Sequence, residues 1–62
     1  MDKLKQKRLE AGLTQVELAE KCGIKQTTLS AIENGRNDGS IKLAKKMCKV
    51  LGCTLNDLIT FQ

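Results

Sequence analysis

The stretch that decides the fold is Thr14–Asn34, with the sequence TQVELAEKCGIKQTTLSAIEN. Its first half begins with Thr14 and Glu17 at the spacing of a capping box, in which each side chain satisfies a backbone N–H group left free at the start of a helix. The two halves meet at the turn Cys22–Lys25, which contains a glycine. A short turn with a glycine makes two helices cross at a steep angle. The pattern therefore predicts two helices, the first starting at Thr14, joined by a tight turn.

The second of these helices, about Gln26 to Asn34, is expected to have a surface without charge. Its large apolar residues are only Leu29 and Ile32, and no charged residue occurs from Gln26 to Ile32, although 29% of the chain is charged. Any one of its short polar side chains is typical of a solvated surface, but a whole face of them is not. Small polar side chains let a helix backbone come close to base edges in the major groove of DNA. We therefore interpret this segment as a candidate recognition helix.

Glycines divide the rest of the chain into further helices. Four of them follow stretches with helical periodicity, where a left-handed cap favours glycine: Gly12, Gly23, Gly35 and Gly52. The other predicted helices are Asp2–Ala11, one that starts after Ser40, and one capped by Thr54 with Asp57 three residues on. No stretch alternates with period two, so no sheet is expected. We predict one all-α domain over residues 1–62, a compact five-helix bundle with the helix-turn-helix at its second and third helices.

Helical periodicity also predicts which side chains face the core. The candidates are Leu4, Arg8, Leu9, Ala11, Val16, Leu18, Ala19, Cys22, Leu29, Ile32, Ile41, Ala44, Met47, Cys48, Leu51, Leu55, Leu58 and Ile59. Four lysines lie on the other side of the fourth segment and predict an ordinary solvated face. They are Lys42, Lys45, Lys46 and Lys49.

The overall charge permits a polyanionic partner without requiring one. Eleven Lys and Arg residues against seven Asp and Glu residues give a net charge of +4 and a pI near 9.2. The start of the chain, MDKLKQKRLE, is too charged for the apolar region of a signal peptide. No apolar run approaches the roughly 18 residues that a membrane span needs. We therefore expect a cytoplasmic protein with no membrane partner.

Catalytic and metal-binding chemistry has little support in the sequence. Cys22, Cys48 and Cys53 are an odd number at irregular spacing, and the chain has no histidine. Structural zinc requires four ligands, so we expect buried free thiols and no metal. There is no plausible pair of nucleophile and base and no glycine motif that cradles a phosphate. We expect neither an enzyme nor a cofactor, and no small-molecule ligand.

Three stretches of the chain carry a family pattern. They are GLTQVELAEKCGI at residues 12–24, TLSAIENGR at 28–36 and LGCTLNDL at 51–58. Together they closely resemble the phage-repressor-like Cro/cI (XRE-type) helix-turn-helix family over nearly the whole chain. The resemblance implies a fold like that of the lambda-repressor DNA-binding domain, with double-stranded DNA as partner. Lys25 departs from the pattern, because it replaces the usual Ser, Thr or Asp before the recognition helix. This weakens the cap by about 1 kcal/mol and adds a cation.

The resemblance also implies roles for single residues. Base edges would be read by Gln26, Thr27, Thr28 and Ala31, with Gln26 suited to the N6 and N7 atoms of adenine. Phosphates would be bound by Gln15, Lys25, Asn34, Arg36 and Asn37. In the family, the counterparts of Arg8 and Glu33 form a partly buried ion pair that links the first helix to the end of the third.

These assignments predict a sequence-specific transcriptional regulator. We expect a repressor that binds an inverted repeat as a weak homodimer, with half-sites one helical turn of DNA apart, ~34 Å. Leu58 and Phe61 are either core residues or a dimer contact, and we favour the dimer contact. The alternative function is a protein-interaction module, such as an antitoxin or antirepressor with the same fold. The predicted phosphate ligands Gln15, Asn34 and Arg36 favour DNA binding over this alternative.

Overall fold

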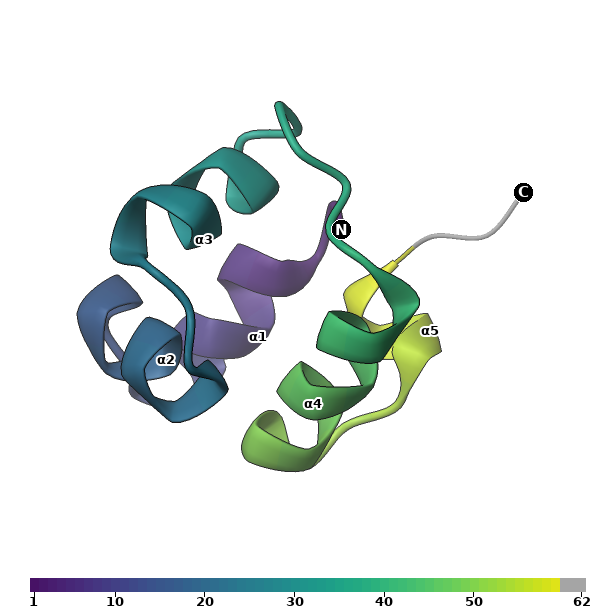
Figure 1. Cartoon of the computed structure of the whole chain (residues 1–62). Helices are drawn as coiled ribbons and strands as arrows, with labels where there is room; N and C mark the ends of the chain where they lie inside the picture. The colour runs from purple at the N-terminus through teal and green to yellow at the C-terminus, as the bar shows by residue number, and fades with distance from the viewer. Residues whose placement is uncertain (60–62) are drawn as a thin grey trace.

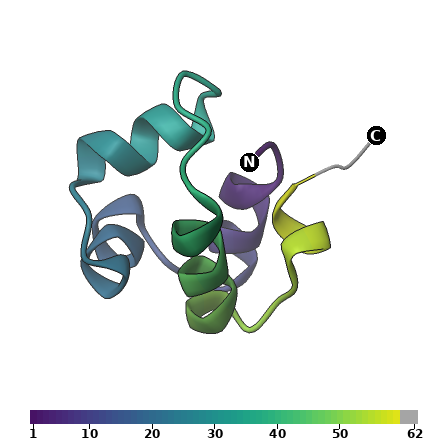
Figure 2. The same ribbon diagram turned by 45° about the vertical axis from the view of Figure 1, so that its right-hand side comes forward.

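The computed structural model describes residues 1–59, and within this range it contains five helices and no strand (Figure 1). They are α1 (Leu4–Glu10), α2 (Gln15–Cys22), α3 (Gln26–Glu33), α4 (Ile41–Leu51) and α5 (Leu55–Leu58). The predicted all-α five-helix bundle is confirmed. Both views show α1 in the middle, with α2 and α3 on one side of it and α5 on the other (Figures 1 and 2). No helix within residues 1–59 is long and apolar enough to cross a membrane.

The start of α2 is stabilised by the predicted capping box. The Thr14 hydroxyl accepts a hydrogen bond from the Glu17 N–H at 3.1 Å, and the Thr14 N–H donates to the Glu17 carboxylate at 2.9 Å. These bonds hold the pKa of Glu17 below its ordinary value, because they favour the charged form. The helix α3 has no equivalent, since the side chain of Lys25 makes no cap hydrogen bond. The start of α3 therefore lacks the side-chain cap that α2 has.

The turn between α2 and α3 depends on Gly23. Its φ of +69° is left-handed, a conformation that other residues rarely adopt. The Gly23 and Ile24 N–H groups then donate back to the Glu20 and Ala19 carbonyls at 3.2 and 3.0 Å. Ile24 is half-buried against the core. The turn thus ends α2 and reverses into α3 within three residues.

The core draws on all five helices. Its fully buried apolar side chains are Leu4, Leu18, Ala19, Cys22, Leu29, Ile32, Ala44, Met47 and Leu58. The core prediction is wrong for three residues, because Leu9, Val16 and Ile41 are 59%, 46% and 59% exposed. Ala11 is exposed as well, since it follows the last residue of α1. The four α4 lysines are exposed as predicted.

The cysteines differ from one another in burial. All three thiols are free, but only Cys22 is fully buried, while Cys48 and Cys53 are half-buried. The prediction of buried thiols is therefore correct for Cys22 alone. Cys48 is in α4 and Cys53 follows the end of that helix, so both lie at the edge of the core.

The structure corrects the assignment of Leu58 to a dimer contact. This side chain has no exposed surface and packs in the core with Leu4 and Met47. Its carbonyl accepts a hydrogen bond from the Lys3 N–H at 2.9 Å, which fastens α5 to the start of the chain. The physical reason is that α5 has only four residues and packs against both α1 and α4. Phe61, the other residue assigned to that contact, lies outside the described residues.

Replacing Leu58 by Ala tests this correction. Loss of a fully buried leucine side chain should lower the free energy of unfolding by about 2–5 kcal/mol. The matched control is Leu9→Ala, which removes an exposed leucine and should change it by less than about 0.5 kcal/mol. Urea unfolding followed by circular dichroism measures both. A Leu58→Ala protein as stable as the Leu9→Ala protein would contradict the burial of Leu58.

Candidate nucleic-acid interface

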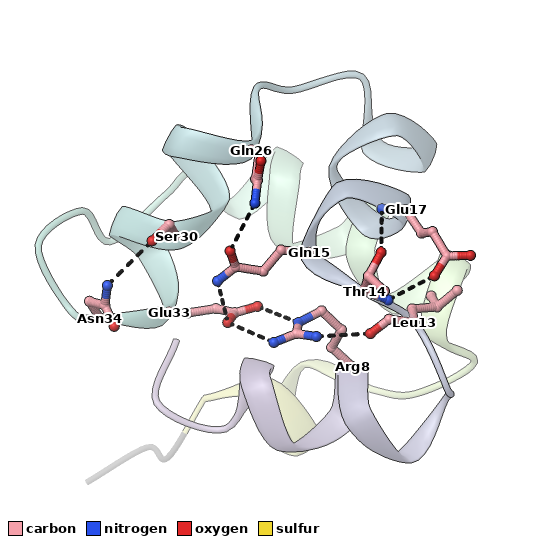
Figure 3. Close-up of polar contacts among 9 residues, drawn as sticks. All are labelled: Arg8, Leu13, Thr14, Gln15, Glu17, Gln26, Ser30, Glu33 and Asn34. Atoms are coloured by element: carbon pink, nitrogen blue, oxygen red, sulfur yellow. Dashed lines mark hydrogen bonds and ion pairs between the residues drawn. The ribbon is translucent and has the colours of Figure 1, made fainter.

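A buried ion pair joins α1 to the end of α3. The Arg8 Nε donates to Glu33 Oε2 at 2.8 Å, and Nη2 donates to Oε1 at 3.2 Å (Figure 3). The third guanidinium nitrogen, Nη1, donates to the Leu13 carbonyl at 2.8 Å. The Arg8 and Glu33 side chains are only 7% and 2% exposed. The predicted pair is therefore present, and it is more deeply buried than expected.

The ion pair continues into a chain of hydrogen bonds that ends at the first residue of α3. Gln15 Nε2 donates to Glu33 Oε1 at 3.1 Å, and Gln26 Nε2 donates to Gln15 Oε1 at 3.4 Å (Figure 3). The carboxylate of Glu33 can only accept, so the amide of Gln15 must turn its nitrogen toward it. The amide oxygen of Gln15 then faces Gln26. The buried pair thus sets the orientation of two amide side chains, of which Gln26 is exposed.

The exposed face of α3 carries the residues predicted to read bases. Gln26 and Thr27 are exposed, and Thr28 and Ala31 are half-exposed. Leu29 and Ile32 are fully buried on the other side. The structure therefore brings the four predicted base-reading residues to the surface of one helix, where Thr28 and Ala31 are less exposed than Gln26 and Thr27.

One further residue belongs to this face. Ser30 is half-exposed, and its hydroxyl oxygen accepts a hydrogen bond from the Asn34 side chain at 3.4 Å. It lies four residues after Gln26, which is the spacing of one helical face. Ser30 is one of the short polar residues of this helix, but it was not among the residues predicted for the site. The four-residue spacing was the signal that could have placed it there.

The loop after α3 presents the remaining predicted phosphate ligands. Arg36 and Asn37 are exposed, and their backbone N–H groups both donate to the Ala31 carbonyl, at 2.9 and 3.2 Å. The Asn37 side-chain oxygen accepts from the Gly39 N–H at 2.9 Å. Gly39 has a φ of +70°, so the loop turns at a residue without a side chain. These bonds fasten the loop to the C-terminal turn of α3.

The electrostatics of this surface follow from the ion pair. Glu33 is the only charged residue in α3, and its side chain is buried against Arg8. The exposed face of α3 is therefore uncharged, while Lys25 precedes the helix and Arg36 follows it. A neutral helix flanked by cations is suited to a groove whose rims are lined with phosphates.

The family comparison agrees with this geometry. A family model described as helix-turn-helix matches residues 4–58. The chain belongs to the XRE-type helix-turn-helix family. An uncharacterized HTH-type transcriptional regulator of Methanocaldococcus jannaschii is 41% identical over 61 residues, which cover 98% of this chain and 92% of that protein. Another, of Archaeoglobus fulgidus, is 34% identical over 95% of this chain and 84% of its own length.

Solved structures of similar domains support the same assignment. The N-terminal DNA-binding domain of SinR from Bacillus subtilis has a TM-score of 0.81 and 35% identity, over 95% of this chain and 87% of that chain. A hypothetical transcription factor from Neisseria also has a TM-score of 0.81, with 33% identity over 89% of this chain. The match spans 62% of the Neisseria chain, which is less than two thirds of it. This helix-turn-helix family consists of DNA-binding transcriptional regulators and is not a class of enzymes.

Neutralising Glu33 tests the role of the ion pair in this helix-turn-helix domain. Glu33→Gln would leave the buried guanidinium of Arg8 without its counter-charge, which should cost about 3–5 kcal/mol of stability. The control is Glu10→Gln, which removes the exposed pair between Lys7 and Glu10, at 3.3 Å, and should cost less than about 1 kcal/mol. Equal unfolding midpoints for the two variants in urea would show that the buried pair does not support the fold.

Proposed function

We propose that this protein is a transcriptional repressor that reads an inverted-repeat operator as a weak, symmetric dimer. The observation that carries the proposal is the bonded chain from Arg8 through Glu33 and Gln15 to Gln26. It presents an oriented, exposed amide at the start of a helix whose exposed face is uncharged. Repression would follow because the bound protein occupies promoter DNA. We expect it to act in the cytoplasm.

Gln26 is the residue proposed to read a base most specifically. Its amide nitrogen has two hydrogens, and one of them is already donated to Gln15. The second hydrogen can donate to adenine N7 while the amide oxygen accepts from N6, which is the bidentate pattern for adenine. Thr27, Thr28 and Ala31 would add contacts to thymine methyl groups or nearby phosphates. The hydrogen bond to Gln15 restricts the rotation of Gln26 before DNA binds.

The proposed phosphate ligands lie on both sides of α3. Gln15 uses one amide hydrogen for Glu33 and retains another for a phosphate oxygen, beside the free N–H groups at the start of α2. Lys25, Asn34, Arg36 and Asn37 would bind the backbone around the helix. All four are exposed. They would fix the register of α3 without reading sequence.

The proposed dimer is weak because the described surface offers little apolar area for it. The large exposed apolar side chains within residues 1–59 are Leu9, Val16 and Ile41, and each is on a different helix. Stable dimers bury contiguous apolar surface. Two domains would therefore associate mainly when both occupy half-sites one turn of DNA apart, ~34 Å.

Selection of bound sequences from a random pool of double-stranded DNA tests this function. We expect enrichment of an inverted repeat whose half-sites are one helical turn apart. Sedimentation in parallel should show monomer at micromolar concentration without DNA. Enrichment of a single half-site would contradict the dimer. No enrichment, together with binding that does not fall as salt is raised, would contradict DNA recognition and favour a protein-interaction module.

The variants Gln26→Ala and Arg36→Gln should weaken binding to the selected operator in different ways. Gln26→Ala should weaken specific binding by about 1–3 kcal/mol and relax the preference at one base pair. Arg36→Gln should weaken binding to every sequence alike and lower the slope of log affinity against log salt by about one. Titrations on the operator and on single-base variants at several salt concentrations separate these effects. A uniform loss with Gln26→Ala would show that Gln26 reads no base.

A further inference from the structure

The end of α4 holds two of the three cysteines, Cys48 and Cys53, close to each other. Gly52 has a φ of +67° and ends the helix, and the Gly52 and Cys53 N–H groups both donate to the Cys48 carbonyl. The bond from the Cys53 N–H is 3.0 Å long. The bond from the Cys53 N–H is the one that defines a Schellman motif, in which the side chain after the glycine packs against the side chain of the residue whose carbonyl accepts that bond. Here both of those side chains are thiols.

The backbone geometry suits a bond between the two sulfur atoms. A 3.0 Å bond from the Cys53 nitrogen to the Cys48 oxygen limits the Cα–Cα distance to less than about 7 Å. Disulfides in proteins span Cα–Cα distances of roughly 4.4 to 6.8 Å. The Cys48 thiol also lies close enough to the Cys53 thiol to raise the pKa of Cys53. The described residues contain no group of three or more His, Cys, Asp and Glu side chains that could hold a metal ion.

A surface hollow gives small reagents access to Cys53, whereas the third thiol, Cys22, is buried. Cys53 lines a surface hollow together with Lys7, Glu10 and Asp57. Cys48 is also half-buried. Cys22, in contrast, is 2% exposed and packs inside the core. The protein therefore has one accessible pair of thiols and one inaccessible thiol of the same chemical type.

We propose that Cys48 and Cys53 form a reversible redox pair, which closes to an intrachain disulfide when a small disulfide such as oxidised glutathione reacts with it. The Cys53 thiolate attacks one sulfur of the small disulfide, forms a mixed disulfide and releases one small thiolate. The Cys48 thiolate then attacks the Cys53 sulfur and releases the second. The two protein thiols are oxidised and give up two protons, and the small disulfide is reduced to two thiols. The new bond would join the end of α4 to the residue before α5.

The surroundings of Cys53 make this reaction slow at neutral pH. Burial raises the pKa of Cys53, and the adjacent Cys48 thiol and the Asp57 carboxylate raise it further, while Lys7 opposes them. Glu10 also lines the hollow and adds a second carboxylate. A raised pKa leaves less thiolate for attack, so the rate should increase from neutral toward alkaline pH. The pair would thus respond to sustained disulfide stress and ignore brief exposure.

Mass spectrometry of the native full-length protein treated with oxidised glutathione tests the proposal. The intact mass should fall by two hydrogen masses, and a reductant should restore it. Trypsin cleaves after Lys49, between the two cysteines, so the oxidised protein should yield Met47–Lys49 linked to Val50–Gln62. The yield of this linked pair should increase with pH.

Single variants provide the controls. Cys22→Ala should form the same linked peptides at the same rate as the wild type. Cys48→Ser should stop at a stable glutathione adduct on Cys53, because no second thiol displaces it. Separate, persistent adducts on Cys48 and Cys53 in the wild type would overturn the proposal, as would a disulfide that involves Cys22 or a second chain. Two thiols that stay unmodified in the folded protein but react after unfolding would also overturn it.

Discussion

The fold and the candidate interface both depend on the buried ion pair between Arg8 and Glu33. Removing two charges from water is costly, and the cost is offset only where the charges meet in good geometry and their other hydrogen bonds are satisfied. Both conditions hold here, because the guanidinium donates to both carboxylate oxygens and to the Leu13 carbonyl. The pair ties α1, the connection to α2 and the end of α3 to one another. In a domain of 62 residues, with a small apolar core, this polar link adds contacts between helices that the core alone does not supply.

The same pair determines the charge and the side-chain orientation on the exposed surface of α3. Because Glu33 is neutralised inside the protein, the outward face of α3 has no anion to repel a phosphate. Because Glu33 also accepts from Gln15, it orients the amide that in turn contacts Gln26. The start of α3 has no side-chain cap, and Gln26, its first residue, is connected to α2 through the hydrogen bond to Gln15. The Glu33 carboxylate therefore contributes both to stability and to the arrangement of side chains on the candidate reading surface.

The excess positive charge of the protein lies on a different helix from the candidate reading surface. Four of its eleven basic residues lie on α4, which has no acidic residue, while the rest of the chain has seven basic and seven acidic residues. The excess positive charge thus lies on α4, while the exposed face of α3 has no charged residue. In the proposed function, general attraction to a polyanion and recognition of sequence would be carried by different residues.

Local features of this protein were determined by sequence alone. The helix starts at Thr14 and Thr54, the turn at Gly23 and the uncharged face of α3 each depend on a few neighbouring residues, so spacing predicted them. Periodicity could not tell whether an apolar residue near the end of a short helix meets another helix or solvent. Leu9 and Ile41 were therefore misplaced in the core, and both are exposed. Leu58, for which a dimer contact was favoured, is buried because α5 packs against α1 and α4. The bonds from Glu33 through Gln15 to Gln26 also needed the tertiary structure, because they join α2 and α3 side chains separated by up to eighteen residues.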